Sequence, residues 1–284
     1  MGNLPSSYQD LIERACSPIK IPTQWKQNLA SLPLNDKLKM LELLKQKKRW
    51  QELTQIVTWF RTPEVRAAYG KQMLFFKNGA KDDERGLFGG NRTGKTHCGV
   101  FEDVLHLTGL YPEWWVGRRF DRPIEMWAAT DTAKNTRDIL QEKFCGKPGI
   151  DQMYGTGMIP GDLLLRRTVK HGLADAFESV FVQHVSGGVS TLQLKSYDQG
   201  RESFQGTRQD LIHLDEEPKL EIYTECLLRL MSTVPGESNG SLILTETPLL
   251  GISELMVTFM PELKPEPDAI PVQAWESEEV SVLD

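Results

Sequence analysis

The chain has 284 residues, of which 39% are hydrophobic and 25% charged, with a formal net charge of −6 at pH 7. This length can bury one large α/β core, alone or with an appendage, and no apolar run approaches the ~20 residues of a membrane-spanning helix. The negative charge argues against a surface uniformly coated for nucleic acid, but leaves room for local basic patches. Four widely separated cysteines without a C-x-x-C pair predict reduced thiols in a cytosolic protein, not a metal site or disulfides.

Residues 1–60 favour helices. The segment 33–36 (PLND) predicts a helix start, and leucines then recur at the spacing of one helix face. This apolar stripe comprises Leu38, Leu41 and Leu44, with Met40 and Leu43 as further candidates. The basic side chains that follow are expected to close the helix, where cations suit the dipole, with a contact to DNA or a subunit as the alternative. They are Lys45, Lys47, Lys48 and Arg49.

Residues 61–79 (RTPEVRAAYGKQMLFFKNG) predict a helix that leads into the core. Pro63 suits the first turn, because its missing N–H would have no helical partner there. The larger side chains then fall at helical spacing. They are Tyr69, Gln72, Phe75 and Phe76.

A phosphate-binding loop is the most specific motif in the chain. A short apolar strand at Leu87 and Phe88 runs into residues 89–96, GGNRTGKT, which fit G-x-x-x-x-G-K-[ST] without a mismatch. An apolar, helix-like run follows at residues 100–105. The motif consists of Gly89, Gly90, Asn91, Arg92, Thr93, Gly94, Lys95 and Thr96. A glycine turn with an idle lysine is the alternative interpretation.

The chemistry of a bound polyphosphate explains this spacing. Glycines let consecutive backbone N–H groups curl around a phosphate, an approach that a Cβ would block. Lys95 reaches the β- and γ-phosphates, and Thr96 offers its hydroxyl to Mg²⁺. The helix that follows points its positive N-terminus at the anion. The motif therefore predicts a nucleotide and Mg²⁺.

A strand and a helix are expected after the loop. Residues 124–130 (IEMWAAT) predict a buried strand, and residues 131–144 predict a helix capped by Asp131 or Thr132. Residues 145–178 are glycine-rich and contain one apolar run, at 163–165.

An antiparallel hairpin is expected next. Residues 179–185 and 191–196 each alternate between apolar and polar side chains, and a Ser-Gly-Gly turn separates them. Residues 211–214 and 241–246 are two further apolar runs that predict strands.

Two acids end the first of these runs. A P-loop enzyme needs one acid at the end of a neighbouring strand to hold the Mg²⁺ shell and a second to orient and deprotonate water. Asp215 suits the first role and Glu216 the second. Glu217 precedes a proline and suits a helix N-terminus, and His213 is expected to be a packed core residue.

The strand at 241–246 ends in Thr245-Glu246-Thr247-Pro248. Hydroxyls at the carboxyl end of a strand lie where open α/β sheets bind ligands, so Thr245 and Thr247 can sense the γ-phosphate. A polar strand-to-loop junction fixed by Pro248 is the alternative.

These motifs together carry a family resemblance. The phosphate loop, the segment 196–218 (SYDQGRESFQGTRQDLIHLDEEP) and the strand end LTETP resemble the large terminase subunit of tailed bacteriophages, the ATPase motor that packages DNA into procapsids. The resemblance covers roughly residues 66–260. It implies an ATPase that uses ATP and Mg²⁺, with a P-loop NTPase fold of the RecA-like (ASCE) type. Such a fold has a mainly parallel central sheet flanked by helices, with an N-terminal helical lid.

The resemblance also implies roles for single residues. Arg92 lies inside the loop as in terminases, and the lysine, hydroxyl and acid positions match. Thr245 to Pro248 match the coupling motif, although Glu246 stands where a small residue is commoner. Gln72 resembles the glutamine that reads adenine, since an amide can both donate to and accept from one base edge; an exposed helical glutamine is the alternative.

An arginine finger is a further expectation. Arg201 precedes the acidic strand, where similar terminases carry an arginine that acts on the neighbouring subunit's γ-phosphate. Arg92, acting within its own subunit, and Arg208 are the alternatives.

The expected domains are a helical lid at 1–60, an ATPase core at 61–263 and a linker at 264–284 toward an absent RNase H-like nuclease domain. We expect no nuclease activity from this chain, whose tail acids do not form a cluster. The implied partners are double-stranded DNA, the portal protein, the small terminase subunit and further copies in a ring, expected to be a pentamer, in the host cell cytoplasm and without a membrane. Candidate DNA contacts are Arg118, Arg119 and Arg122, or Arg166, Arg167 and Lys170.

Two other functions compete with a packaging motor. One is a helicase-like or other RecA-type ATPase, which would need a second RecA-like domain. The other is an ATP-gated assembly protein with negligible turnover, against which the Asp215-Glu216 pair argues.

Overall fold

The computed structural model describes residues 4–16, 31–53, 55–232, 238–248 and 251–263. The chain divides into two compact units, Met1–Pro248 and Leu249–Asp284. The first unit contains all the described strands, and the second contains two short helical elements. The predicted linker at 264–284 lies outside the described residues, and the division into lid, core and linker stays a prediction.

Helices and strands alternate along the first unit. The helical elements are α1 (Tyr8–Cys16), α3 (Leu34–Leu53), η2 (Gln55–Val57), α4 (Pro63–Ala68), α5 (Gly70–Asn78), α6 (Lys95–Thr108), α7 (Ala133–Asn135), η3 (Thr136–Gln141), α8 (Glu142–Cys145), η4 (Asp151–Met153), η5 (Gly161–Leu163), η6 (Tyr197–Gln199), η7 (Arg201–Phe204), α9 (Leu220–Leu230), α10 (Glu254–Phe259) and η8 (Pro261–Leu263). The strands are β1 (Glu84–Phe88), β2 (Glu125–Thr130), β3 (Leu164–Val169), β4 (Phe177–Gln183), β5 (Val189–Ser196), β6 (Leu211–Asp215) and β7 (Ser241–Glu246). Among the described residues, none of the helices has the length and apolar character needed to cross a bilayer.

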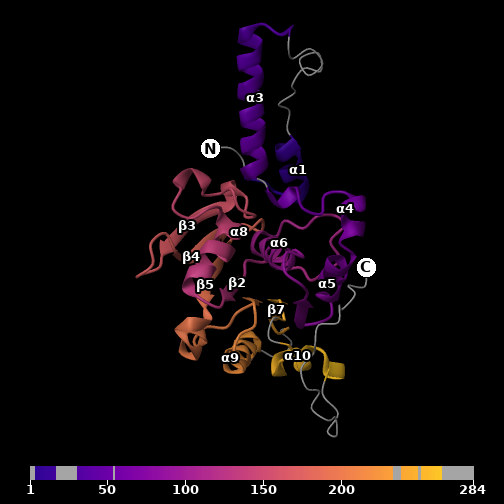
Figure 1. Ribbon diagram of the computed structural model, residues 1–284, viewed down its shortest axis with the longest axis vertical. Coiled ribbons are helices and arrows are strands. Elements are labelled where there is room, and N and C mark those ends of the chain that lie inside the picture. Colours follow the sequence, from indigo (N-terminus) through magenta and orange to yellow (C-terminus); the bar gives the residue numbers. More distant parts are fainter. Residues whose placement is uncertain (1–3, 17–30, 54, 233–237, 249–250, 264–284) are drawn as a thin grey trace, which may run out of the picture. The chain divides into compact units, whose positions relative to one another are not determined.

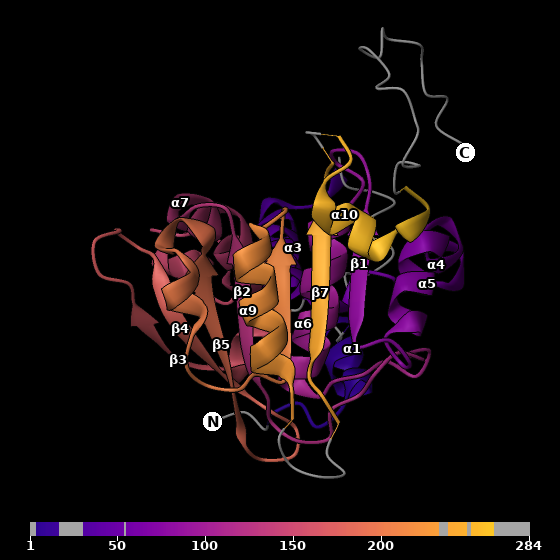
Figure 2. The same ribbon diagram turned by 90° about the horizontal axis from the view of Figure 1, so that it is seen from below.

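The described strands form one seven-stranded sheet in the order β1-β7-β6-β2-β5-β4-β3. Figure 2 shows them side by side. The five strands from β1 to β5 in this order run parallel, while β4 and β3 add an antiparallel edge. The mainly parallel sheet confirms the predicted fold class, and the β4–β5 pair confirms the predicted hairpin. One strand, β7, separates the P-loop strand β1 from the acidic strand β6.

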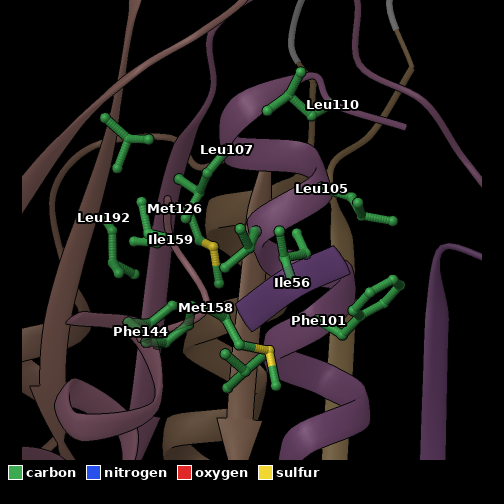
Figure 3. Close-up of a cluster of buried hydrophobic side chains, with 14 of the residues drawn as sticks. Ile56, Phe101, Leu105, Leu107, Leu110, Met126, Phe144, Met158, Ile159 and Leu192 are labelled. Carbon is green, nitrogen blue, oxygen red and sulfur yellow. The ribbon is translucent and has the colours of Figure 1, made fainter. Parts of the chain in front are cut away.

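Helices cover both faces of this sheet. The P-loop helix α6 lies against one face and α9 against the other (Figures 1 and 2). Nearly all of α6 is buried, including Phe101 and Leu105. Figure 3 shows these side chains in one apolar cluster with Met126 of β2, Leu192 of β5 and Phe144 of α8. The helix that begins at the P-loop is therefore the centre of the hydrophobic core, which holds the loop rigidly.

A buried ion pair fixes α6 to the P-loop strand. Arg85 of β1 donates to both carboxylate oxygens of Glu102 in α6, at 3.1 and 2.8 Å, and also to the carbonyl of Phe75 in α5. Both charged side chains are buried. Breaking such a pair would leave an uncompensated buried charge, so the pair holds β1, α5 and α6 in one arrangement.

Two predictions for α3 are wrong. The basic run does not close the helix, which continues to Leu53 because residues 50–53 contain no glycine or proline. The leucine stripe is also not a buried face: Leu38, Leu41 and Leu44 are exposed, and Met40 is the buried candidate.

Other helices and strands differ from expectation in detail. The helix from Pro63 is capped by Thr62 but breaks at Tyr69, giving α4 and α5. The helix expected over 131–144 starts at the Thr132 cap, as predicted, but contains the π-helical η3 between α7 and α8. The illegible segment contributes β3, whose mostly solvent-facing side chains leave it without a clear apolar pattern.

Candidate active site

The P-loop connects β1 to α6. Gly94 has φ +84° and Arg92 has φ +64°, both in the left-handed region. Glycine adopts this region freely but arginine only at a cost, so the loop contains a strained turn. The N–H of Gly89 donates to the carbonyl of Glu246 at 3.2 Å, which ties the loop to β7.

Lys95 is the first residue of α6 and is buried in the loop. Its Nζ donates to the carbonyl of Gly90 at 2.8 Å, so the ammonium lies inside the curve of the P-loop. Burial lowers the pKa of Lys95, while the nearby Glu216 and Asp215 oppose this shift. The cation is therefore desolvated and faces the acids that follow β6.

Asp215 joins three elements at the carboxyl end of β6. Its Oδ1 accepts a hydrogen bond from Thr96 Oγ1 of α6 at 2.8 Å and another from Thr245 Oγ1 of β7 at 2.6 Å. The residue is only 3% exposed. Three predicted site residues, far apart in the chain, thus meet on one carboxylate oxygen.

Glu216 has φ +69°, which is strained for a residue with a side chain. Its N–H donates to the Thr245 carbonyl at 2.7 Å, and its Oε2 accepts from the Thr247 N–H at 3.2 Å. Burial raises the pKa of Glu216, while the Thr247 hydrogen bond opposes this shift. Strain of this kind persists where the surrounding structure holds a side chain in place, here at the edge of the candidate site.

Glu246, the unusual residue of the LTETP strand end, is almost completely buried. Burial raises its pKa to about 7, and the neighbouring Glu217 adds to the shift. Its Oε2 has no hydrogen-bond partner among the described residues. A larger, acidic side chain is thus accommodated at this position next to the site.

A cavity of about 690 Å³ opens in front of the loop, a volume typical of ligand sites. Glu216 and Thr247 line it at the sheet edge, together with P-loop residues 91–96. The remaining wall is Trp59, Phe60, Tyr69, Gln72, His97, Ile139 and Lys143. Gln72 Nε2 donates to the carbonyl of Thr93 at 3.2 Å, so the amide lies beside the loop. Sequence patterns did not single out Trp59 or Lys143, because neither belongs to a motif.

The residues at this site suit Mg²⁺. The Thr96 hydroxyl and the Asp215 carboxylate are hard oxygen donors, which this ion prefers. Within the described ranges, no three His, Cys, Asp or Glu side chains are grouped as a metal cage. A single carboxylate with a hydroxyl is the arrangement in which Mg²⁺ takes its other ligands from substrate phosphates and water.

The three candidate arginines lie in different places. Arg92 is exposed and lines the cavity. Arg201 does not line it: its Nε donates to Glu225 Oε2 of α9 at 2.9 Å. Arg208 Nη2 donates to the carbonyl of Ser238 at 3.2 Å. Arg201 therefore has no direct access to the cavity of its own chain.

His213 is a buried core residue, as expected, but a hydrogen-bonded one. Its Nδ1 lies 2.5 Å from Asp103 Oδ2 of α6, and its Nε2 lies 2.8 Å from Thr245 Oγ1. Burial lowers the pKa of His213, but the adjacent Asp103 carboxylate outweighs burial and the net shift is upward. A Cβ on Gly99 would come within 2.3 Å of the imidazole, so glycine is required there. This pair links the P-loop helix to the Thr245–Asp215 hydrogen bond.

A P-loop after β1, paired acids after β6 and a strand interposed between them define a P-loop NTPase fold of the RecA-like type. The family model described as "Terminase large subunit, T4likevirus-type, N-terminal" matches residues 87–279. This match covers well over half of the chain, and the chain belongs to this family.

Individual relatives agree with this assignment. The large terminase subunit of Salmonella phage P22 is 29% identical over 249 residues, which cover 82% of this chain and 48% of the relative. The chain therefore spans about half the length of that relative. The large terminase ATPase domain of Thermus phage P74-26 is 14% identical over 65% of this chain and 68% of its own, with a TM-score of 0.39. The large terminase of bacteriophage HK97 is 13% identical over 66% of this chain and 33% of its own, with a TM-score of 0.40.

Proposed function

We propose that the chain is the ATP-hydrolysing motor domain of a phage terminase large subunit, which powers translocation of double-stranded DNA into a procapsid. One observation carries this proposal. Asp215 accepts hydrogen bonds from both Thr96 and Thr245, at the edge of a cavity of nucleotide size that Glu216 also lines. An acid beside the P-loop hydroxyl, with a second acid next to it, is what phosphoryl transfer to water requires. Membership of the terminase family supports the packaging role.

Each residue then has a role in hydrolysis. Lys95 and the backbone N–H groups of the P-loop neutralise the phosphates. Mg²⁺, held through Thr96 and Asp215, would supply charge stabilisation at the β- and γ-phosphates. Glu216 orients the attacking water and accepts its proton. The hydrogen bond from the Thr247 N–H keeps the carboxylate of Glu216 directed at the cavity.

Gln72 is the proposed reader of adenine. It lies at the cavity wall beside Tyr69 and Trp59, whose rings offer surfaces on which a base can stack. Thr245 and Thr247 are the proposed coupling residues, because they link the two acids to β7 through Asp215 and Glu216.

The partners of the whole protein follow from the family. We expect a homo-oligomeric ring, a pentamer, around double-stranded DNA, acting with the portal protein and the small terminase subunit in the host cell cytoplasm. We expect no DNA cleavage by this chain, because two-metal nucleases need clustered acids and the described residues contain no such group. ATP turnover that depends on Glu216 distinguishes this motor from an ATP-gated assembly protein.

Arg201 is the proposed finger for the neighbouring subunit. Arg201→Ala and Lys95→Ala proteins should each be inactive alone, and a mixture of the two should recover part of the ATPase activity. Recovery is expected because some interfaces would pair an intact P-loop with an intact finger, and such an arginine contributes about 10³–10⁵ in rate. Phosphate release, measured against mixing ratio and protein concentration, checks this.

Arg229→Ala is the matched control for this experiment. Arg229 also pairs with Glu225, at 3.0 Å, so its loss disturbs the same carboxylate without removing the proposed finger. Arg229→Ala should therefore keep most of the activity. Absence of recovery in mixed rings shown to exchange subunits would contradict a role in trans.

DNA binding by the chain is expected to be weak and independent of sequence. Four of the candidate arginines already have partners within the chain. These are Asp83 for Arg118, Asp210 for Arg122, and the rings of Phe181 and Tyr154 for Arg166 and Arg167. Contacts to phosphate release counterions, so the affinity should fall steeply with salt, with a slope of about −0.9 per phosphate contact on a log–log plot. Fluorescence anisotropy with two unrelated duplexes checks this, and tight, salt-insensitive binding would contradict it.

A further inference from the structure

Lys143 brings to the cavity a positive charge that the P-loop motif does not include. It lies in α8 and lines the same cavity as Thr96 and Glu216. The preceding segment is the π-helical η3, and Ile139 from that segment also lines the cavity. π-Helical turns occur frequently at functional sites. The chain thus departs from a regular helix at the point where it presents these two side chains to the cavity.

A neutral imidazole holds the ammonium of Lys143. Its Nζ lies 3.1 Å from His97 Nδ1, in the first turn of α6. Burial and the adjacent Lys143 charge lower the pKa of His97 to about 4. The ring is therefore uncharged near neutral pH, and its Nδ1 accepts the hydrogen bond. The imidazole in turn packs against the Trp59 ring, with centroids 4.7 Å apart.

This arrangement leaves the cation without an adjacent counter-charge. In the described part of the chain, His97 is the one hydrogen-bond partner that the structure shows for the Lys143 side chain. Burial lowers the pKa of Lys143, and Asp215 and Glu142 offset only part of that shift. Holding a desolvated cation beside a neutral ring is costly unless a ligand brings negative charge. A polyphosphate in this cavity would bring it.

We propose that Lys143 is a second, cis-acting lysine of the nucleotide site, which contacts the phosphate chain from the wall opposite the P-loop, and that His97 and Trp59 position it. This inference rests on the proposed function of the cavity as the ATP site. Lys95 and Lys143 would then reach the phosphates from two sides of the cavity, one from the loop and one from α8.

The test measures equilibrium binding to the full chain by calorimetry. The probes are Mg-ADP, a non-hydrolysable Mg-ATP analogue and inorganic tripolyphosphate, which has the phosphate chain without base or sugar. Lys143→Met should weaken all three by about 10- to 100-fold, as expected for a hydrogen bond to a charged group. Lys143→Arg should keep most of the affinity. Lys134→Met, at an exposed lysine of α7 in the same helical segment, should bind like the parent chain.

The outcomes separate this inference from the proposed function. If the parent chain binds none of the probes, or if Lys95→Ala leaves binding intact, the ATP site itself is wrong. If Lys95→Ala abolishes binding but Lys143→Met does not weaken tripolyphosphate, only the role of Lys143 is overturned. Thermal melting of each variant without ligand checks the fold, and Lys143→Gln replaces Lys143→Met if the latter does not melt cooperatively.

The role of His97 is tested by a double-mutant cycle. His97→Leu should weaken tripolyphosphate binding less than Lys143→Met does, because the charge remains but is no longer held in place. In the Lys143→Met background, His97→Leu should have no further effect. Additive losses would show that His97 acts independently of Lys143 and would overturn the positioning role.

Discussion

Replacing Lys95 with alanine should abolish nucleotide binding and ATP turnover. The residue is buried at the start of α6, and its ammonium already lies inside the loop on the Gly90 carbonyl. Removing it deletes the cation that neutralises the phosphates, and the remaining charges nearby, Asp215 and Glu216, would then repel an anionic ligand. The expected loss exceeds what a single neutral hydrogen bond would contribute, about 0.5–1.5 kcal/mol. Calorimetry with Mg-ADP and phosphate release with ATP measure the two effects.

Lys81→Ala is a suitable control, since this lysine is exposed in the turn before β1 and does not line the cavity. It should bind and turn over nucleotide like the parent chain. Near-normal turnover in Lys95→Ala would refute the assignment of residues 89–96 as the phosphate-binding loop.

Glu216→Gln should separate nucleotide binding from hydrolysis. Glutamine has the shape of glutamate and can still accept the Thr247 hydrogen bond, but it cannot take a proton from water. Asp215 and Thr96 are unchanged, so Mg-nucleotide should bind with nearly the parent affinity. Loss of a general base typically lowers the rate by about 10²–10⁴-fold. Single-turnover phosphate release beside equilibrium binding shows whether the two properties separate.

The neighbouring acids provide the controls for the register of β6. Asp215→Asn should weaken the dependence on Mg²⁺, whereas Glu217→Gln should leave hydrolysis largely intact. If Asp215→Asn spares hydrolysis while Glu217→Gln abolishes it, the metal and base roles belong one position further along the chain.

Local sequence pattern was sufficient for the P-loop and for most strands. The loop depends on neighbours in the chain: Gly94 adopts φ +84° and the helix begins at Lys95, because the required backbone conformation is written into consecutive residues. The strands β2, β6 and β7 were predicted because each is a short apolar run that the sheet buries on both faces. The π-helical η3 was not predicted, because helical spacing does not reveal one additional residue in a turn.

The sequence by itself thus determined the fold class, the P-loop and the candidate acids, since these depend on short-range spacing. Only the tertiary structure decided which side chains meet. The insertion of β7 between β1 and β6 brings Thr245 onto Asp215, and the packing of α8 against α6 brings Lys143 to His97. The docking of α9 against η7 likewise pairs Arg201 with Glu225. Such contacts join residues far apart in the chain, and they depend on strand order and helix packing, about which local spacing carries no information.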